Sequence, residues 1–249
     1  MVSLAAQERQ DRLLAELRAT QSVALSDAAM QLGVSEMTVR RDLDRLEERG
    51  LARRVRGGAV YAGPVSFGGR SRSHSEEKRE IARKLLPLVP EEGVIALDSS
   101  TTMHHLAGAI EGGGDLTVVT NGLLTFEALR GRPGIVAILT GGRQDARSDS
   151  LIGPVATATL DAMRFTAFFA SAAAIDPQFC FEDTFEEAEV KKAFARAAGQ
   201  VVLGAHSDKL GAVATAAAVP LERVGVLATE LPAAAPELQE YRGRVPRVL

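Results

Sequence analysis

The residues best suited to chemistry in this chain of 249 residues lie in three polar segments, each directly after a short apolar run. They are Asp98, Ser99, Ser100, Thr101 and Thr102 in the first segment, Thr120 and Asn121 in the second, and Gly141 and Gly142 in the third. Hydroxyls and backbone N–H groups at the start of a helix bind anions such as phosphate, and glycine lets the backbone come close to a ligand. Together the segments favour a polyol phosphate as ligand, although each alone is also typical of an ordinary helix cap.

A second candidate set is rich in arginine and lies in the first quarter of the chain. Residues 1–72 contain twelve arginines and nine acidic residues, giving +3, while the other 17 bases and 23 acids give −6. The total of −3 therefore hides a basic part that suits nucleic acid, since guanidinium groups bind phosphates and guanine edges. The alternative is a basic loop that contacts only solvent. The candidate DNA-binding residues are Ser26, Ser35, Met37, Thr38, Arg40, Arg41, Arg45, Arg53, Arg54, Arg56, Gly57 and Gly58.

Three short helices with a tight turn are predicted around these arginines. Helical spacing and capping residues place them over residues 7–17, over 27–32 after Ser26 as N-cap, and from Ser35 to Arg49 before Gly50 as C-cap. Gly33 supplies the turn between the second helix and the third. The third helix has a buried stripe, Val39, Leu43 and Leu46, which leaves its arginines on other faces. This arrangement is typical of a helix-turn-helix.

Residues 51–61 alternate polar and apolar types around Gly57 and Gly58, which predicts a small two-stranded wing. In a winged helix-turn-helix the third helix enters the major groove, where Arg40 and Arg41 would bond guanine edges. The arginines of the wing would contact backbone phosphates. We therefore expect double-stranded operator DNA as a partner, the alternative being a three-helix unit that does not bind DNA.

The rest of the chain alternates short apolar runs with helical stretches, which predicts a largely parallel sheet with helices on both faces. Strands are predicted over 94–97, 116–120, 135–139, 165–170, 201–203 and 224–228, and helices over 76–86, 102–110, 123–129, 154–163 and 186–197. Ligands of such sheets bind at the carboxyl ends of the strands, where the three polar segments lie. The predicted fold class is α/β, with an N-terminal winged helix-turn-helix followed by a largely parallel α/β domain.

Composition shifts divide the chain into four parts. We expect a DNA-binding domain over 1–61, a linker over 62–75, an effector-binding domain over 76–235 and a loosely attached C-terminal tail over 236–249. The single cysteine, Cys180, excludes an internal disulfide and is typical of a reducing cytoplasm. No apolar run reaches the roughly 18–20 residues of a membrane span, and the polar start does not resemble a signal peptide. A cytoplasmic protein without a membrane partner is expected.

The motif of the third helix and wing resembles the DNA-binding signature of the DeoR family of bacterial transcriptional regulators. The matching residues are Ser35, Thr38-Val39-Arg40-Arg41-Asp42-Leu43, Leu46, Gly50-Leu51, Arg54-Val55 and Gly57-Gly58-Ala59. The family's sensor domain is matched by Asp98 to Thr102 (except at Ser100), Thr120-Asn121, Gly141-Gly142 and the loop that contains Lys209. The resemblance implies a sensor similar in fold to ribose-5-phosphate isomerase that responds to phosphorylated sugars. It also implies that Lys209 is the cation for the phosphate or carbonyl end of the ligand.

Three positions depart from the family's pattern. Ser100 replaces a glycine of the phosphate loop, Ala173 replaces an acidic residue that faces the ligand, and His206 replaces an aspartate. The fold and the regulatory role survive these changes. The identity of the effector, including whether it is phosphorylated, stays open.

The alternative function is a sugar-phosphate isomerase or deaminase with a fused DNA-binding domain. Such chemistry needs a carboxylate as general base, and Asp98, Glu187 and Glu189 are available. The alanines at 172–174, however, remove a carboxylate position that the related enzymes use. We therefore expect a repressor of carbohydrate-metabolism genes that is controlled by a small metabolite, with no catalytic residues and no cofactor.

A metal site at His104, His105 and His206 is not expected, because adjacent histidines on a helix point about 100° apart. A single module of this size makes few base contacts, so binding to two half-sites is needed for useful specificity. The expected state is a homo-oligomer, either a dimer or a tetramer.

Overall fold

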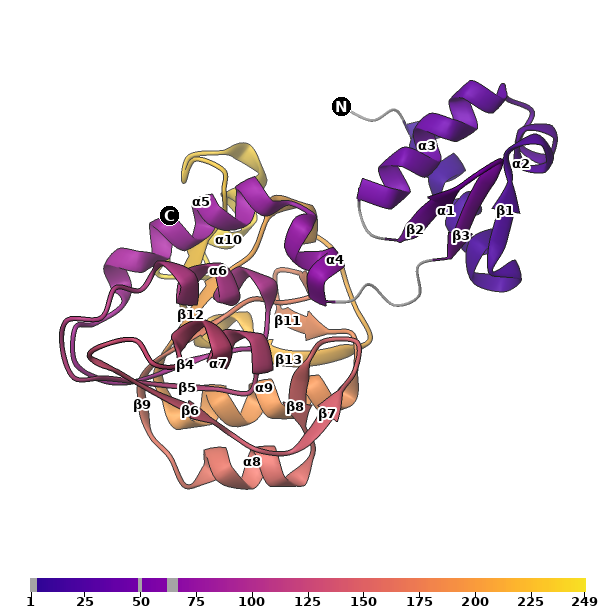
Figure 1. Ribbon diagram of the computed structural model, residues 1–249. Helices are drawn as coiled ribbons and strands as arrows, with labels where there is room; N and C mark the ends of the chain where they lie inside the picture. Colours follow the sequence, from indigo (N-terminus) through magenta and orange to yellow (C-terminus); the bar gives the residue numbers. More distant parts are fainter. Residues whose placement is uncertain (1–3, 49–50, 62–66) are drawn as a thin grey trace. The chain divides into compact units, whose positions relative to one another are not determined.

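The computed structural model describes residues 4–48, 51–61 and 67–249, and the chain forms two compact units, Met1–His74 and Ser75–Leu249. Figure 1 shows both units. The α/β fold class that the sequence predicts is confirmed. Among the described residues, no helix combines the length and the apolar character that crossing a membrane requires.

The smaller unit combines helices with a three-stranded antiparallel sheet in the order β1-β3-β2 (Figure 1). Its elements are α1 (Leu4–Thr20), β1 (Ser22–Ala24), α2 (Leu25–Leu32), α3 (Glu36–Glu48), β2 (Ala52–Val55), β3 (Gly58–Tyr61) and α4 (Phe67–Arg72). Val39, Leu43 and Leu46 are fully buried, as the helical spacing predicts, and they pack with leucines of α1. The predicted wing is the β2–β3 hairpin, and β1 adds a strand that the sequence did not reveal.

The start of the second helix differs from the prediction. Helix α2 begins at Leu25 after Ala24, and no side chain caps it, whereas Ser26 lies inside the helix and donates to Asp27 Oδ1 at 3.1 Å. The reason is that β1 pairs with β3 up to Ala24, so the chain leaves the sheet there and turns directly into the helix with Leu25 buried. Gly33 ends α2 in the left-handed conformation (φ 65°), as predicted. The predicted C-cap region at Arg49 and Gly50 lies outside the described residues.

The segment predicted as a linker contains an element of its own. Residues 62–66 lie outside the described part of the chain, and residues 67–72 form α4, whose Phe67 is buried. The segment predicted as a linker therefore includes a six-residue helix.

The larger unit is built on a seven-stranded parallel sheet in the order β15-β14-β12-β9-β4-β5-β6. Its strands are β4 (Gly93–Leu97), β5 (Leu116–Thr120), β6 (Ile135–Leu139), β9 (Phe165–Ala170), β12 (Ala198–Gly204), β14 (Val224–Ala228) and β15 (Arg247–Val248). Six of them were predicted, since each contains a run of apolar residues bounded by polar or glycine residues. The carboxyl ends of β4, β5 and β6 are in register, with Leu97 opposite Thr120 and Thr120 opposite Leu139.

Helices cover both faces of this sheet, as Figure 1 shows. One face packs against α5 (Ser75–Leu85), α6 (Thr101–Ala109) and α7 (Leu123–Leu129), and the other against α8 (Pro154–Asp161) and α9 (Phe185–Ala197). On the second face, the rings of Phe168 and Phe194 stack with their centroids 4.8 Å apart. A hairpin, β7 (Arg143–Asp145) and β8 (Ser150–Ile152), and a small sheet of β10 (Ala174–Ile175), β11 (Phe179–Glu182) and β13 (Ala216–Pro220) complete the unit.

The C-terminal residues are not the loosely attached tail that the sequence predicts. Helix α10 (Gln239–Arg242) places Tyr241 in the core with 2% of its surface exposed, and Leu238 and Val245 are buried beside it. Strand β15 then pairs with β14 and becomes the last strand of the sheet. The proline and alanine content of the segment gives no indication of this docking, in which Leu249 also takes part by packing against the core and donating its N–H to the carbonyl of Leu227 at 2.9 Å.

Candidate DNA-binding surface and effector site

Helix α3 presents its arginines to solvent. Arg40, Arg41 and Arg45 are exposed, and Met37 is 58% exposed. Ser35 precedes the helix, and its hydroxyl accepts the backbone N–H of Thr38 at 3.2 Å, which satisfies one of the free donors of the first turn. The outward face of α3 therefore carries long cationic side chains on a helix whose other face is fixed by burial.

Asp42 is the polar exception on the buried face of α3. Its carboxylate is 1% exposed and accepts from Arg9 and, at 3.1 Å, from Gln10 Nε2, both on α1. A buried carboxylate is stable only when it is paired and hydrogen-bonded. Asp42 therefore fixes α3 on α1 and is unavailable to DNA, which explains an acidic residue in the middle of an arginine-rich helix.

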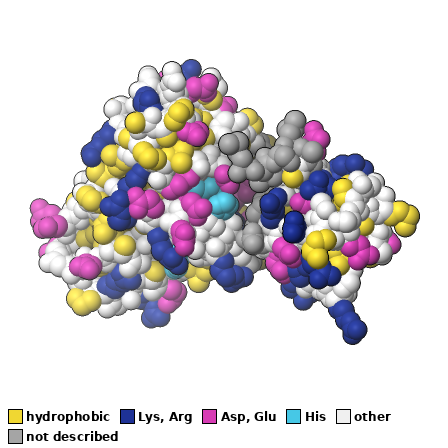
Figure 2. All heavy atoms as spheres, turned by 90° about the horizontal axis from the view of Figure 1, so that it is seen from above, with side chains coloured by type: hydrophobic (Ala, Val, Ile, Leu, Met, Phe, Trp, Pro, Cys, Tyr) yellow, Lys and Arg dark blue, Asp and Glu magenta, His cyan; other side chains and the backbone are white. Residues whose placement is uncertain are grey.

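The wing arginines differ from one another. Arg53 and Arg56 are exposed, whereas the Arg54 side chain is 20% exposed and pairs with Asp44 of α3 at 3.3 Å. The backbone N–H of Arg54 also donates to Glu47 at 2.6 Å. Arg54 thus ties the wing to α3, and the two exposed arginines are the better candidates for phosphate contacts. Figure 2 shows basic side chains in dark blue on the smaller unit, among acidic and apolar ones.

Glycines shape the wing for steric reasons. Gly57 makes the hairpin turn with φ 84°, a conformation that other residues rarely adopt. A Cβ atom on Gly58 would lie 2.1 Å from the backbone oxygen of Val23, so β3 approaches β1 too closely for any side chain there.

The three polar segments of the larger unit meet at the carboxyl edge of the sheet. A Cβ on Gly122 would lie 2.8 Å from Ser99 Cα, which shows how closely the first two segments approach each other. The N–H of Thr140 donates to the carbonyl of Thr120 at 3.0 Å, and the N–H of Leu151 donates to the carbonyl of Asn121 at 2.7 Å. The sequence-predicted residues are therefore neighbours in space.

The first segment leads into α6 as predicted. Ser100 is the N-cap, and its hydroxyl accepts the N–H of Met103 at 3.1 Å. Thr102 and Asn121 are buried, and within the described structure Thr102 Oγ1 and Asn121 Oδ1 have no hydrogen-bond partner. Thr125 Oγ1 of α7 is also buried without a hydrogen-bond partner among the described residues, and no sequence pattern pointed to it. Each such atom costs about 1–3 kcal/mol unless a ligand or water pairs with it.

The carboxylate of Asp98 is hydrogen-bonded within the protein. Its carboxylate is buried and accepts from Ser100 N at 2.9 Å, Ser171 N at 2.8 Å and Lys191 Nζ at 2.7 Å. Lys191, on α9, also pairs with Glu182 at 2.6 Å. Burial raises the pKa of Glu182 to about 7 although the ammonium of Lys191 lowers it. Asp98 therefore fixes the backbone of the first polar segment, and its carboxylate is paired with the ammonium of Lys191.

Lys209 reaches the segment in which the expected acidic residue is missing. It lies on the turn η2 (Ser207–Lys209), and its ammonium donates to Ser171 Oγ at 3.2 Å and to the carbonyl of Ala172. Gly141 and Gly142 have positive φ angles of 77° and 125°. A Cβ on Gly142 would lie 2.8 Å from the carbonyl oxygen of Ile152, so packing of the β7–β8 hairpin already requires this glycine.

Comparison with known proteins decides the family. A model described as the DeoR C terminal sensor domain matches residues 73–230, and one described as the DeoR-like helix-turn-helix domain matches residues 9–65. The chain belongs to the DeoR family. It is a regulator of the helix-turn-helix type with a C-terminal sensor, as the resemblance in the sequence implied.

Relatives of this DeoR-family chain match along nearly their whole length. The HTH-type transcriptional regulator GolR of Listeria innocua is 31% identical over 228 residues, covering 90% of each chain. The HTH-type transcriptional repressor CsqR of Escherichia coli is 31% identical over 240 residues, covering 94% of this chain and 92% of its own. Ribose 5 phosphate isomerase A from Neisseria gonorrhoeae is a solved structure that aligns with a TM-score of 0.37 and 18% identity, over 55% of this chain and 53% of that chain.

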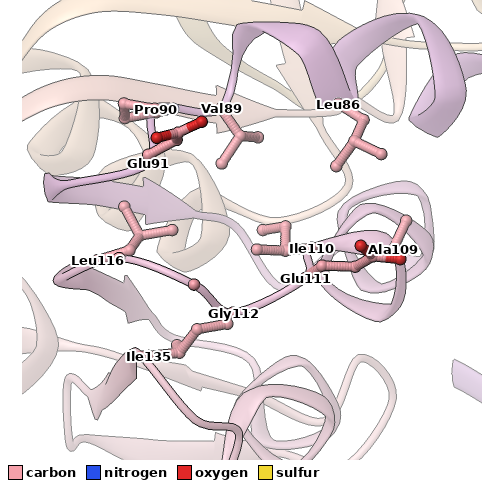
Figure 3. Close-up of a pocket in the computed structure, with 13 residues that line it drawn as sticks. Leu86, Val89, Pro90, Glu91, Ala109, Ile110, Glu111, Gly112, Leu116 and Ile135 are labelled. Atoms are coloured by element: carbon pink, nitrogen blue, oxygen red, sulfur yellow. The ribbon is translucent and has the colours of Figure 1, made fainter.

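A cavity of about 440 Å³ lies at the opposite edge of the sheet in this DeoR-family sensor (Figure 3). It is lined by Leu116 and Ile135, the first residues of β5 and β6, and by the carboxylates Glu91 and Glu111. The strands are five residues long, so this edge is about 13 Å from the carboxyl ends. Its two acidic side chains do not suit an anion, so it does not replace the predicted site.

Proposed function

We propose that the chain represses genes of carbohydrate metabolism and that a sugar phosphate bound at the carboxyl edge of the sheet changes its affinity for operator DNA. The observation that carries the DNA-binding part is the exposed row of Arg40, Arg41 and Arg45 on a helix anchored from behind by Asp42. The names of two relatives support repression: CsqR is a transcriptional repressor, and a 27% identical protein of Escherichia coli O157:H7 is named as the aga operon transcriptional repressor.

The DNA-binding part is tested with an operator fragment selected from genomic DNA by the full chain. Arg41→Ala is expected to weaken operator binding by about 1–3 kcal/mol and to relax specificity at one base position. Arg56→Ala should weaken all sequences alike and reduce the slope of log K against log salt by about one. Arg83→Ala, on the larger unit, is the control for a lost exposed arginine. Unchanged operator binding by Arg41→Ala would refute the assignment of the recognition helix.

The proposal includes self-association. One winged module buries little DNA surface, so two copies on two half-sites supply the specificity that regulation needs. Light scattering of the full chain, alone and with operator, should give an even number of copies. Equal affinity for a half-site and for the complete operator would contradict binding of the operator by two copies of the chain.

The effector is assigned to the site of Ser99, Thr102, Asn121 and Lys209. Support comes from the unpartnered buried oxygens of Thr102 and Asn121 and from the ammonium of Lys209 at the same edge. A thermal-shift screen of sugars, sugar phosphates and sugar acids tests this, with Lys209→Ala and Thr102→Ala as site variants and Lys192→Ala as the matched control. The site variants should lose the shift, and an unchanged response in both would remove the site.

We also infer that the chain does not catalyse isomerisation or deamination of sugar phosphates. The carboxylate of Asp98 is already engaged by Lys191 and two backbone N–H groups, so it is a poor general base. Ala173 offers no acid in its place. Incubation of the full chain with ribose 5-phosphate or glucosamine 6-phosphate should give no product, and turnover would overturn this inference.

A further inference from the structure

The loop that carries Lys209, residues 205–211, is held from both sides by residues that follow it in the chain. On its amino side the backbone N–H of Ser207 donates to both carboxylate oxygens of Glu230, at 3.2 and 3.0 Å, and the Ser207 hydroxyl donates to the same carboxylate. Glu230 is half-buried and follows β14, at the carboxyl edge of the sheet. Its carboxylate therefore fixes the start of the turn that bears Lys209.

On the carboxyl side the same loop is held by Tyr241 of α10. The hydroxyl of Tyr241 accepts the backbone N–H of Gly211 at 2.9 Å and donates to the carbonyl of Ile175 at 3.1 Å. Its ring is buried in the main core cluster, so the hydroxyl is presented from a fixed position. Tyr241 thus joins the Lys209 loop to the chain segment 171–175, and Leu210 forms a β-bridge with Ile175 beside it.

These contacts bracket Lys209 symmetrically in the sequence. Ser207 lies two residues before it and Gly211 two residues after it, and both are tied through their backbone N–H groups. The ammonium of Lys209 donates to Ser171 and Ala172, in the same segment whose Ile175 carbonyl accepts from the hydroxyl of Tyr241. Because the lysine side chain is a flexible four-carbon stem, the position of its ammonium is well defined only when the backbone of the lysine is fixed.

We propose that Glu230 and Tyr241 are positioning residues of the effector site, which fix the loop so that the ammonium of Lys209 meets the anionic end of the ligand; this rests on the proposed function. Neither group needs to touch the ligand. Without the Tyr241 hydroxyl, the backbone N–H of Gly211 loses its acceptor and only the β-bridge of Leu210 still joins the loop to Ile175, while the buried ring keeps its apolar contacts. At metal sites, removing supporting groups of this kind lowers affinity by roughly 10- to 100-fold.

The test uses the full chain with Tyr241→Phe and Glu230→Gln, and with Tyr61→Phe on β3 and Glu222→Gln, an exposed residue before β14, as matched controls away from this loop. Hydrogen exchange is followed by mass spectrometry without any ligand. Both site variants should exchange about tenfold faster in peptides covering 205–211, while peptides of β4, β9 and α9 keep the exchange of the parent and the melting temperature changes little. Equal exchange in 205–211 for variants and controls would overturn the proposal, and so would faster exchange throughout the larger unit.

The second readout is a thermal-shift titration with ribose 5-phosphate as probe. The concentration for half-maximal shift should rise about tenfold or more in both variants, while operator affinity without the probe equals that of the parent. An unchanged half-maximal concentration despite faster exchange would overturn the positioning role. If the parent gives no shift with this or any other sugar phosphate, the proposed effector class fails, while the exchange measurement still decides whether Glu230 and Tyr241 fix the loop.

Discussion

Replacing Lys191 with methionine should destabilise the larger unit far more than any other single lysine change on α9. The Lys191 side chain is 7% exposed and holds Asp98 and Glu182, whose side chains are 5% and 13% exposed, at 2.7 and 2.6 Å. Methionine fills nearly the same volume, so the cost arises from two carboxylates left without their cation. Breaking a buried ion pair in this way costs about 3–5 kcal/mol. For the unit formed by Ser75–Leu249, this corresponds to a melting temperature lower by about 6–20 °C.

Scanning calorimetry of the full chain at pH 8 measures this shift, and the neighbouring residue supplies the control. Lys192 is 38% exposed and pairs with Glu189 one helical turn away at 2.8 Å, so Lys192→Met should change the stability by less than about 1 kcal/mol. Adding Glu182→Gln to Lys191→Met removes one of the stranded charges and should restore part of the loss. If Lys191→Met and Lys192→Met melt within about 2 °C of each other, the buried pair does not stabilise the site and the reasoning is wrong.

The pH dependence of the same variant has a definite direction. Burial raises the pKa of Glu182 to about 7 from an ordinary value of 4.5, so the folded chain binds this proton more tightly than the unfolded chain. Stability from this group is therefore present at low pH and is lost as the pH rises from about 4.5 through 7. Without Lys191 the pKa rises further, so the deficit of Lys191→Met should shrink between pH 8 and pH 5. A deficit that grows on acidification would contradict this account.

Three further predictions concern single residues. Asp42→Ala should destabilise the smaller unit by about 1–3 kcal/mol and lower operator affinity, because Arg9 loses its buried partner; circular dichroism melting and mobility shift measure both effects. Gly58→Ala should abolish operator binding while ligand-induced shifts of the larger unit persist, since a Cβ would lie 2.1 Å from the oxygen of Val23. The Cys180 thiol is 1% exposed and burial raises its pKa to about 12, so an aromatic disulfide reagent at pH 8 should react only as fast as the chain unfolds. Full modification within minutes in native buffer would show that the thiol is accessible.

Local patterns were sufficient for most of the sheet and for the helix-turn-helix. Strands such as β5 and β9 are apolar runs bounded by turn residues, and the buried stripe of α3 follows helical spacing, so both are visible without tertiary information. The predicted start of α2 was wrong. The pairing of β1 with β3 determines where the chain leaves the sheet, and this outweighs the capping preference of Ser26.

Local sequence patterns could not predict which residues of the candidate site are hydrogen-bonded to each other. Asp98 and Lys191 are 93 residues apart in the sequence, and either could have been a surface residue on local evidence alone. The contact of Tyr241 with Gly211 and Ile175 was hidden for the same reason, within a segment whose proline and alanine content indicates a tail. Resemblance to a family indicated a candidate site, but only the fold shows which of its polar residues are hydrogen-bonded to one another.

Helix α3 also bears on how such regulators diversify. Its inward residues hold the helix on α1, while Met37, Arg40, Arg41 and Arg45 have no part in the buried core. Exposed substitutions of this kind usually change stability by less than about 0.5 kcal/mol. On the proposal that α3 contacts the operator, a lineage with this architecture can acquire new operator sequences by point mutations of these outward residues without loss of folding.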